Sequence, residues 1–323
     1  MSSSTAALSQ SWPSGLTLTG GIPTKSQDLA AAIIFIVAFA LLIPVAVWRW
    51  STRSTRTWTL LRPTIVLLVR IATYIIRAIE ANGNYSQGLF IGEQVLLLAG
   101  LVPLVEPLVV LLRAHVRRNW IPVPPAQGGE AQRERSLLDR ALRILQLAVL
   151  VALILGIVAG SKAGDATADP DAASSLKTYR YAAIGLTMFV LGLTATVAGV
   201  MHTRESLPVR GTLYIFVVAA VLFIPNIYKL VTSVHPPTLV SSGTKAAFYL
   251  LSALPEFLAI VLYLSVNLND WFGLPAASWK EKVEKKMRKG KWPSGMAYVE
   301  KEDYERIQGG RGVEMGQAPK YTV

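Results

Sequence analysis

The sequence contains no cysteine, and its 323 residues include only three histidines. The absence of cysteine excludes disulfide bonds, thiol nucleophiles, iron–sulfur clusters and cysteine-ligated zinc within the chain. His115, His202 and His235 fall in separate predicted loops, and no HExxH or GxSxG pattern occurs. We therefore expect a protein that is not an enzyme and that binds neither a metal ion nor another cofactor.

Charge is scarce as well, and long apolar runs take its place. Charged residues make up 16% of the chain and hydrophobic residues 52%, whereas a soluble domain has about 25% charged residues. A helix of about 20 apolar residues crosses the hydrocarbon core of a bilayer, and runs of this kind recur. We predict an all-α polytopic membrane protein, a bundle of seven transmembrane helices. The predicted spans are Leu29–Trp48, Leu60–Ile79, Gly88–Leu112, Ile144–Gly160, Tyr181–Met201, Thr212–Tyr228 and Lys245–Leu268.

The distribution of lysine and arginine predicts which end of the bundle faces the cytoplasm. If successive connections alternate sides, one side carries 23 of these residues and the other carries five. Because basic residues collect in cytoplasmic loops, we predict an N-out/C-in orientation. The same rule explains the net charge of +12 without nucleic acid, so we expect no such partner. The predicted location is the plasma membrane or an endomembrane.

Three segments follow from this pattern: a disordered extracellular tail (1–28), the seven-helix bundle (29–268) and a basic cytoplasmic tail (269–323). The last contains the spacing of a short amphipathic helix. Its basic stretch Lys280–Lys291 is expected to attract anionic lipids of the inner leaflet, and the alternative is a solvated flank that only sets orientation. The Pro- and Gly-rich residues 121–135 predict a flexible cytoplasmic loop.

Polar and ionisable side chains inside the predicted spans are the most informative feature. A charge at the bilayer centre costs at least about 2.5–3.5 kcal/mol, so such residues should pair or face water. Those of the second span share one helix face, as do those of the seventh. The candidate substrate- or lipid-binding residues are Arg70, Thr73, Arg77, Glu93, Asn226, Tyr249, Ser252 and Glu256.

Depth in the membrane predicts which of these charges meet. A helix rises about 1.5 Å per residue, and neighbouring spans run in opposite directions. The matching depths predict three pairs: Arg70 with Glu256 at mid-membrane, Arg77 with Glu93 towards the outer side, and Arg62 with Glu106 towards the inner side. Together they describe a buried polar seam between the second, third and seventh spans.

Two interpretations of this seam remain open. Paired charges can simply fix helix register, or they can form a path for a substrate, a lipid headgroup or a proton. Prolines lie beside polar residues in three spans, which favours kinks lining a cavity: Pro103, Pro107, Pro225 and Pro255. The GxxxG pair Gly156 and Gly160 indicates close helix packing in the fourth span.

Three stretches also carry a family resemblance: "RIATYIIRAIEANGNYSQGLFIGEQVLLLAGLVPLVEPLVVLLRAHVRR", "RGTLYIFVVAAVLFIPNIYKLV" and "GTKAAFYLLSALPEFLAIVLYLSV". They resemble spans two, three, six and seven of fungal seven-helix proteins. One such group is the RTA-like lipid-translocating exporter family, and the other is a related uncharacterised fungal family. The first resemblance implies a role in lipid or sterol stress tolerance.

We therefore expect a non-enzymatic membrane protein that binds or translocates an amphipathic lipid-like molecule through the polar seam. The alternative is a seven-helix receptor or sensor that signals to the cytoplasm. Its rhodopsin-like form would show an outer disulfide, a DRY-like motif and an NPxxY-like motif, none of which the sequence contains. A membrane hydrolase is a third, weaker alternative because the chain lacks clustered metal ligands.

Overall fold

The computed structural model describes residues 18–52, 55–84, 86–119, 128–167, 169–205, 207–235, 238 and 241–274. These residues form helices and no strands. Seven of the helical segments are long and apolar enough to cross a membrane. The all-α, seven-helix prediction is therefore confirmed, and the protein is a multi-pass integral membrane protein.

Each predicted span corresponds to one helical segment, and several segments consist of consecutive helices. In chain order the elements are α2 (Leu29–Ala40) and α3 (Ile43–Ser51); η1 (Trp58–Leu60) and α4 (Leu61–Ala81); α5 (Gln87–Ala99), η2 (Val102–Leu104) and α6 (Val105–Asn119); α7 (Gly128–Ser161); η4 (Asp165–Thr167) and α8 (Pro170–Glu205); α9 (Val209–Val234); α10 (Ser242–Phe248), η5 (Tyr249–Ala253) and α11 (Leu254–Ser265); and α12 (Leu268–Phe272). Most helices extend beyond the predicted spans because polar residues at their ends continue the helix.

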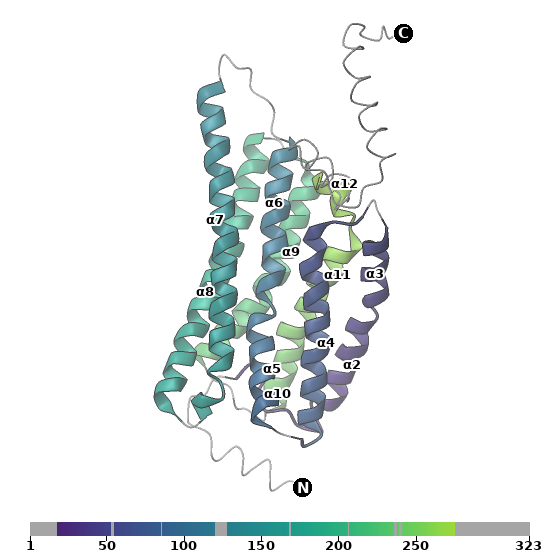
Figure 1. Cartoon of the computed structure of the whole chain (residues 1–323), viewed down its shortest axis with the longest axis vertical. Helices are drawn as coiled ribbons and strands as arrows, with labels where there is room; N and C mark the ends of the chain where they lie inside the picture. Colours follow the sequence, from purple (N-terminus) through teal and green to yellow (C-terminus); the bar gives the residue numbers. More distant parts are fainter. Residues whose placement is uncertain are drawn as a thin grey trace, which may run out of the picture. The chain divides into compact units, whose positions relative to one another are not determined.

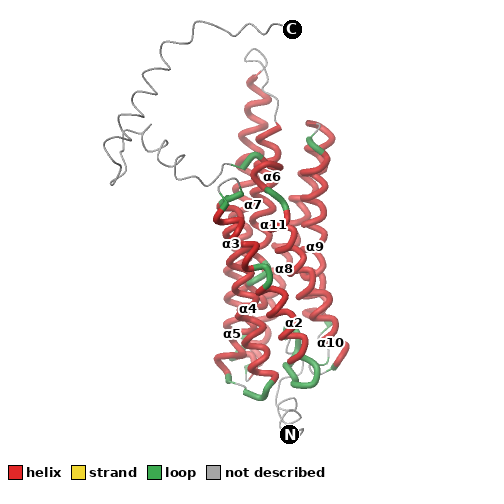
Figure 2. The backbone as a smooth tube through the Cα atoms, turned by 90° about the vertical axis from the view of Figure 1, so that its right-hand side faces the viewer, coloured by secondary structure: helices red, strands yellow, loops and turns green. Residues whose placement is uncertain are grey.

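The spans pack side by side in one bundle (Figures 1 and 2). Helix α4 contacts α2, α5 and α11, while α7 packs between α5 and α8, and α8 packs on α9. The third span, α5 to α6, is the most buried. In its 18-residue apolar stretch 67% of the residues are buried, against 17% in the corresponding stretch of the first span. The third span therefore forms the centre of the bundle, and the first lies at its edge.

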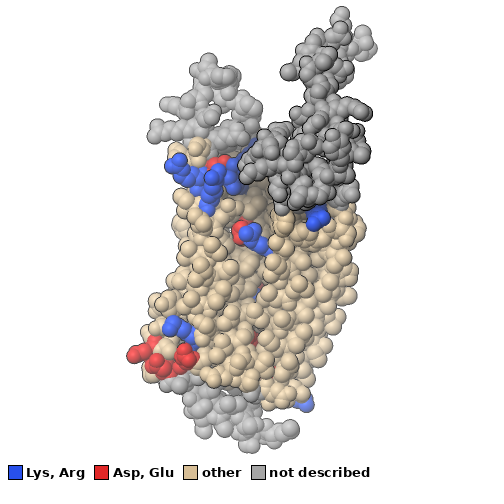
Figure 3. Space-filling view, viewed as in Figure 1, with Lys and Arg blue, Asp and Glu red and all other residues tan. Residues whose placement is uncertain are grey.

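Large apolar side chains cover the outside of the bundle, the reverse of a soluble protein. Leu41, Phe189 and Leu147 are 69%, 61% and 61% exposed. Figure 3 shows a broad, nearly uncharged band between two ends where charged side chains gather. This surface fits lipid tails, which cannot hydrogen-bond or solvate charge.

Proline interrupts the helices where the sequence predicted kinks, with one exception. Helix α5 ends at Ala99, shortly before Pro103 in the 3₁₀ turn η2, and Pro107 lies in the first turn of α6. Pro255 is the second residue of α11, which directly follows the π-helical turn η5. Pro225 instead lies inside α9, which continues on both sides of it.

Two predicted boundaries are corrected. Residues 18–28, assigned to the disordered tail, are folded into the bundle, where Leu18 is 2% exposed and Asp28 is fully buried. Helix α7 begins at Gly128, so residues 128–135 are helical rather than part of a flexible loop. The predictions for residues 1–17, 121–127 and the basic tail from 275 onward fall outside the described residues.

Candidate functional site

Two buried polar clusters occupy the bundle interior. We call the first the Arg77 cluster; it contains Asp28, Arg77, Glu80, Glu93, Lys245 and Tyr249. We call the second the Arg70 cluster; it contains Arg70, Lys229, Ser252 and Glu256. Every one of these side chains belongs to a residue that is at most 7% exposed.

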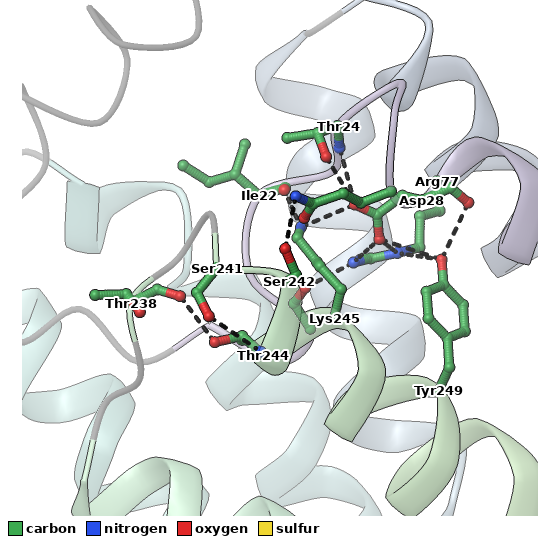
Figure 4. Close-up of polar contacts among 12 residues, drawn as sticks. Ile22, Thr24, Asp28, Arg77, Thr238, Ser241, Ser242, Thr244, Lys245 and Tyr249 are labelled. Atoms are coloured by element: carbon green, nitrogen blue, oxygen red, sulfur yellow. Dashed lines mark hydrogen bonds and ion pairs between the residues drawn. The ribbon is translucent and has the colours of Figure 1, made fainter.

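Arg77 forms the centre of the first cluster. Its Nη1 donates to Glu93 Oε1 at 2.6 Å, and its Nη2 donates to Asp28 Oδ1 at 2.7 Å and to the Gly20 carbonyl at 2.6 Å. Its Nε lies 3.1 Å from both Asp28 Oδ1 and the hydroxyl of Tyr249. Figure 4 shows Asp28, Arg77 and Tyr249 converging in this way. The guanidinium therefore ties the segment before α2 to α4, α5 and η5.

Lys245 completes the same cluster from α10. Its Nζ lies 3.0 Å from Asp28 Oδ2 and also donates to the Ile22 carbonyl. Burial by itself would raise the pKa of the Asp28 carboxyl, but the positive charges of Arg77 and Lys245 outweigh it and hold that pKa below its ordinary value. Asp28 is therefore ionised at neutral pH and bridges two buried cations.

A glycine makes this arrangement possible. Gly20 has a φ of +80°, a conformation that side-chain-bearing residues rarely adopt. A Cβ at this position would lie 3.0 Å from the Phe248 ring and 3.1 Å from Arg77 Nη1. Phe248 in turn lies against the guanidinium, with Arg77 Cζ 4.6 Å from the ring centroid. The backbone of residues 18–28 can therefore approach Arg77 closely only with glycine here.

Glu80 lies at the edge of the Arg77 cluster, and no cation among the described residues forms an ion pair with it. Its carboxyl group is within hydrogen-bonding reach of Glu93. Within the described part of the chain, neither oxygen of Glu80 has a donor, and neither does Glu93 Oε2. Two carboxyl groups therefore face each other at a fully buried position.

The Arg70 cluster lies deeper in the bundle and contains two cations around one carboxylate. Arg70 Nη2 is 2.5 Å from Glu256 Oε2, and Lys229 Nζ is 3.5 Å from Glu256 Oε1. The hydroxyl of Ser252 donates to the same Oε1 at 3.3 Å. Arg70 comes from α4, Lys229 from α9, and the other two from η5 and α11.

The break in the third span supplies further acceptors for these cations. Arg70 Nη1 donates to the Leu96 carbonyl at 3.1 Å, and Lys229 Nζ donates to the Leu97 carbonyl at 2.8 Å. Both carbonyls lie in the last turn of α5, where the helix no longer provides every N–H partner. The helix end therefore helps to solvate two positive charges in place of water.

A small cavity adjoins Lys229. Its volume is about 10 Å³, room for about one water molecule. Apolar residues of the third span and α8 line it together with small residues of α7 and several polar side chains, including Gly156, Ala159, Arg180, Asn226 and Lys229. Arg180 is 1% exposed and lies 3.5 Å from the Thr232 hydroxyl.

The three predicted charge pairs are confirmed. Arg70 contacts Glu256, Arg77 contacts Glu93, and the less buried Arg62 contacts Glu106. Depth matching worked because neighbouring spans run antiparallel and charges that meet must lie at similar heights.

Two of the predicted site residues do not bond to the others. The Thr73 hydroxyl donates to the Val69 carbonyl, and the Asn226 amide donates to the Leu222 carbonyl, each within its own helix. Asn226 still lines the cavity. The remaining predicted residues of the site belong to the two clusters: Arg70, Arg77, Glu93, Tyr249, Ser252 and Glu256.

Sequence reasoning missed five residues of these sites. Asp28, Lys229 and Lys245 lie at or just beyond the ends of the predicted spans and were not among the candidate residues; the longer α9 places Lys229 well inside the bundle. Arg180 preceded the predicted fifth span, whereas α8 begins at Pro170. Glu80 was placed on the polar face of the second span but not in the site. The described residues contain no group of three or more potential metal ligands.

The comparisons with known proteins place the chain in a family without assigning an activity. Neither the search of curated proteins nor the search of solved structures gave a match. One family model matches residues 24–270, a range that contains both clusters. The chain therefore belongs to the family described as Domain of unknown function (DUF7702).

Proposed function

We propose that this membrane protein is not an enzyme and that it binds an amphipathic, lipid-like molecule with an anionic headgroup at the Arg70 cluster. The observation that supports this most directly is the charge of the cluster. Arg70 and Lys229 share Glu256, which leaves one positive charge in excess within that group. An uncompensated charge at this depth is costly, and an anionic group would offset it.

The cavity beside Lys229 indicates where the headgroup binds. In this conformation it holds about one water molecule, so the bound state requires the helices to separate. The wall formed by α7 is its least bulky side, because Gly156 has no side chain and lies close to the α5 backbone; a Cβ there would be 3.4 Å from Ala99 Cα. We propose that the headgroup enters by displacing this wall, in a bundle oriented N-out/C-in within the plasma membrane or an endomembrane.

A pair of matched amphiphiles tests the proposal. Lysophosphatidic acid should raise the unfolding temperature of the purified protein more than lysophosphatidylcholine, which has the same type of chain but a zwitterionic headgroup. A ligand at about 100 times its Kd adds about 2.7 kcal/mol of stability. Lys229→Met, which removes the excess charge, should abolish the difference, whereas Lys177→Met on the exposed surface of α8 should preserve it. Equal stabilisation by both amphiphiles, or a difference that survives Lys229→Met, would contradict the proposal.

The basic tail is a second proposed contact with lipid. We propose that Lys280–Lys291 binds anionic lipid of the inner leaflet, because each basic residue near such a surface contributes about 1 kcal/mol. A synthetic tail peptide should bind phosphatidylserine vesicles and dissociate as salt rises, since ions screen the attraction. Equal binding to neutral phosphatidylcholine vesicles would leave the stretch as a flank that only sets orientation.

One observation favours the alternative function of a sensor. Helix α12 follows the last span and is held against α6 and α9: Phe272 packs edge-on to His115 at 5.5 Å, and Trp271 packs edge-on to Tyr214 at 6.0 Å. A shift of the seventh span would therefore move a surface at this end of the bundle. Because the chain has no cysteine, spin labels at Asn269→Cys and Arg140→Cys would report such a shift. An unchanged label distance on adding lysophosphatidic acid would count against the sensor.

A further inference from the structure

Three oxygen atoms in the Arg77 cluster are buried and have no hydrogen-bond donor among the described residues. They are both carboxyl oxygens of Glu80 and the Oε2 of Glu93. Leaving a buried polar group without a partner costs about 1–3 kcal/mol, and more when the group is charged. Glu93 Oε1 is already held by Arg77 at 2.6 Å, so Oε2 is the oxygen of Glu93 left to accept a hydrogen bond.

The charges of the cluster do not balance if every group is ionised. Three carboxylates, Asp28, Glu80 and Glu93, face two cations, Arg77 and Lys245, and each of the five residues is at most 2% exposed. The hydroxyls of Tyr228 in α9 and Tyr249 in η5 add no charge to this count, since a tyrosine ionises only near pH 10. The fully ionised cluster therefore carries one net negative charge away from water, and a single added proton makes it neutral.

We infer that Glu80 and Glu93 hold one proton between them, so that the cluster is a proton-binding site. The proton resides on Glu80, whose hydroxyl donates to Glu93 Oε2, and Glu93 remains the carboxylate partner of Arg77. One proton from water thus removes the excess charge and supplies the missing donor for Glu93. Two carboxyl groups in contact cannot both ionise without repulsion, and sharing a proton relieves it.

The position of Glu80 gives this proton a route to one aqueous face. Glu80 lies in the last turn of α4, and Asn82 and Gly83, which follow it, are exposed. A proton can therefore exchange at the connection between α4 and α5. Loss of this proton would leave Glu80 as a carboxylate beside Arg77, and this carboxylate would compete with Asp28 for the guanidinium. Proton release would thereby weaken the hold of residues 18–28 on the bundle.

Infrared spectroscopy of the purified protein tests this inference. A protonated carboxylic acid has a carbonyl-stretch band apart from those of carboxylates and amides, and the band shifts in D₂O. At neutral pH the wild-type protein should show it, and Glu80→Gln should lose it. Glutamine keeps the shape of the side chain and its amide can still donate to Glu93, so this variant should retain the wild-type unfolding transition.

Glu106→Gln is the matched control, because Glu106 is a carboxylate paired with Arg62 at the opposite end of the bundle. That variant should keep the acid band. A wild-type spectrum without an acid band would overturn the inference, and so would a band that persists in Glu80→Gln. The wild-type spectrum tests the inference even if Glu80→Gln does not fold. Neither the wild-type spectrum nor that of Glu80→Gln depends on lipid binding at the Arg70 cluster.

Discussion

Replacing Glu256 with glutamine should destabilise the bundle more than any other single change in the Arg70 cluster. Its carboxylate lies 2.5 Å from Arg70 Nη2 and 3.5 Å from Lys229 Nζ. At an effective dielectric constant of about 20, Coulomb's law gives gross attractions of about 7 and about 5 kcal/mol at these distances. Most of this attraction offsets the desolvation of the three groups, so the expected loss is about 3–5 kcal/mol, as for other buried pairs broken from one side.

The stability of the other variants should follow the net charge that each of them leaves in the cluster. Arg70→Gln leaves Lys229 to balance Glu256, so the loss should be below about 3 kcal/mol. The double variant Arg70→Gln with Glu256→Gln still contains the Lys229 charge and should recover only part of the loss. Adding Lys229→Met removes every charge, and this triple variant should be the most stable of those that lack Glu256.

Unfolding in mixed dodecyl maltoside and dodecyl sulfate micelles, followed by the fluorescence of the eight tryptophans, provides the free energies. Two results would refute the reasoning. Arg70→Gln could cost as much as Glu256→Gln, which would show that Lys229 does not share the carboxylate. Alternatively, the triple variant could be no more stable than Glu256→Gln alone, which would show that the loss comes from packing rather than charge.

Further predictions concern packing, acid stability and orientation. Gly160→Ala should destabilise the protein, since a Cβ there would lie 2.5 Å from the α5 backbone, whereas Gly185→Ala meets nothing within 4 Å and should be neutral or stabilising by up to about 1 kcal/mol in the same unfolding assay. Because the pKa of Asp28 is lowered in the folded protein, its contribution to stability is present above the ordinary aspartate pKa of about 4 and is lost as pH falls through the lower folded value. The Asp28→Asn variant should therefore have a lower unfolding temperature at neutral pH, and that temperature should fall less steeply than in the wild type as the pH becomes acidic. In the proposed orientation, an impermeant maleimide should label Asn84→Cys in intact cells and Ser136→Cys only after permeabilisation, and the reverse pattern would invert the bundle.

The sequence was sufficient to predict the spans and the charge pairs for a physical reason. Apolar length decides what crosses a bilayer, and an arginine within such a length requires a partner at its own depth. Arg70 and Glu256 therefore predicted each other although they are far apart in the chain. The same logic failed for Asp28, because a carboxylate just before a span looks like any hydrated flank until the fold brings it to Arg77.

The breaks in the helices were harder to anticipate in detail. Pro103 indicated a kink, but the sequence could not show that the Leu96 and Leu97 carbonyls would accept hydrogen bonds from Arg70 and Lys229, because these contacts depend on which spans are neighbours. Lys229 was misread because the predicted sixth span ended one residue before it, while α9 continues to Val234. Helix boundaries, rather than helix existence, limited the prediction of the site.

The folding of residues 18–28 against the bundle has a consequence for biogenesis. The Lys245–Ile22 contact joins positions 223 residues apart, so the docking of this early segment can be completed only after the seventh span has been made. Arg77 can meet Asp28 as soon as α4 is made, but until the seventh span follows Asp28 lacks its second cation, Lys245. The order of synthesis thus leaves the contacts of this N-terminal segment incomplete until the seventh span is in place, so its full set of ion pairs marks a chain whose insertion is complete.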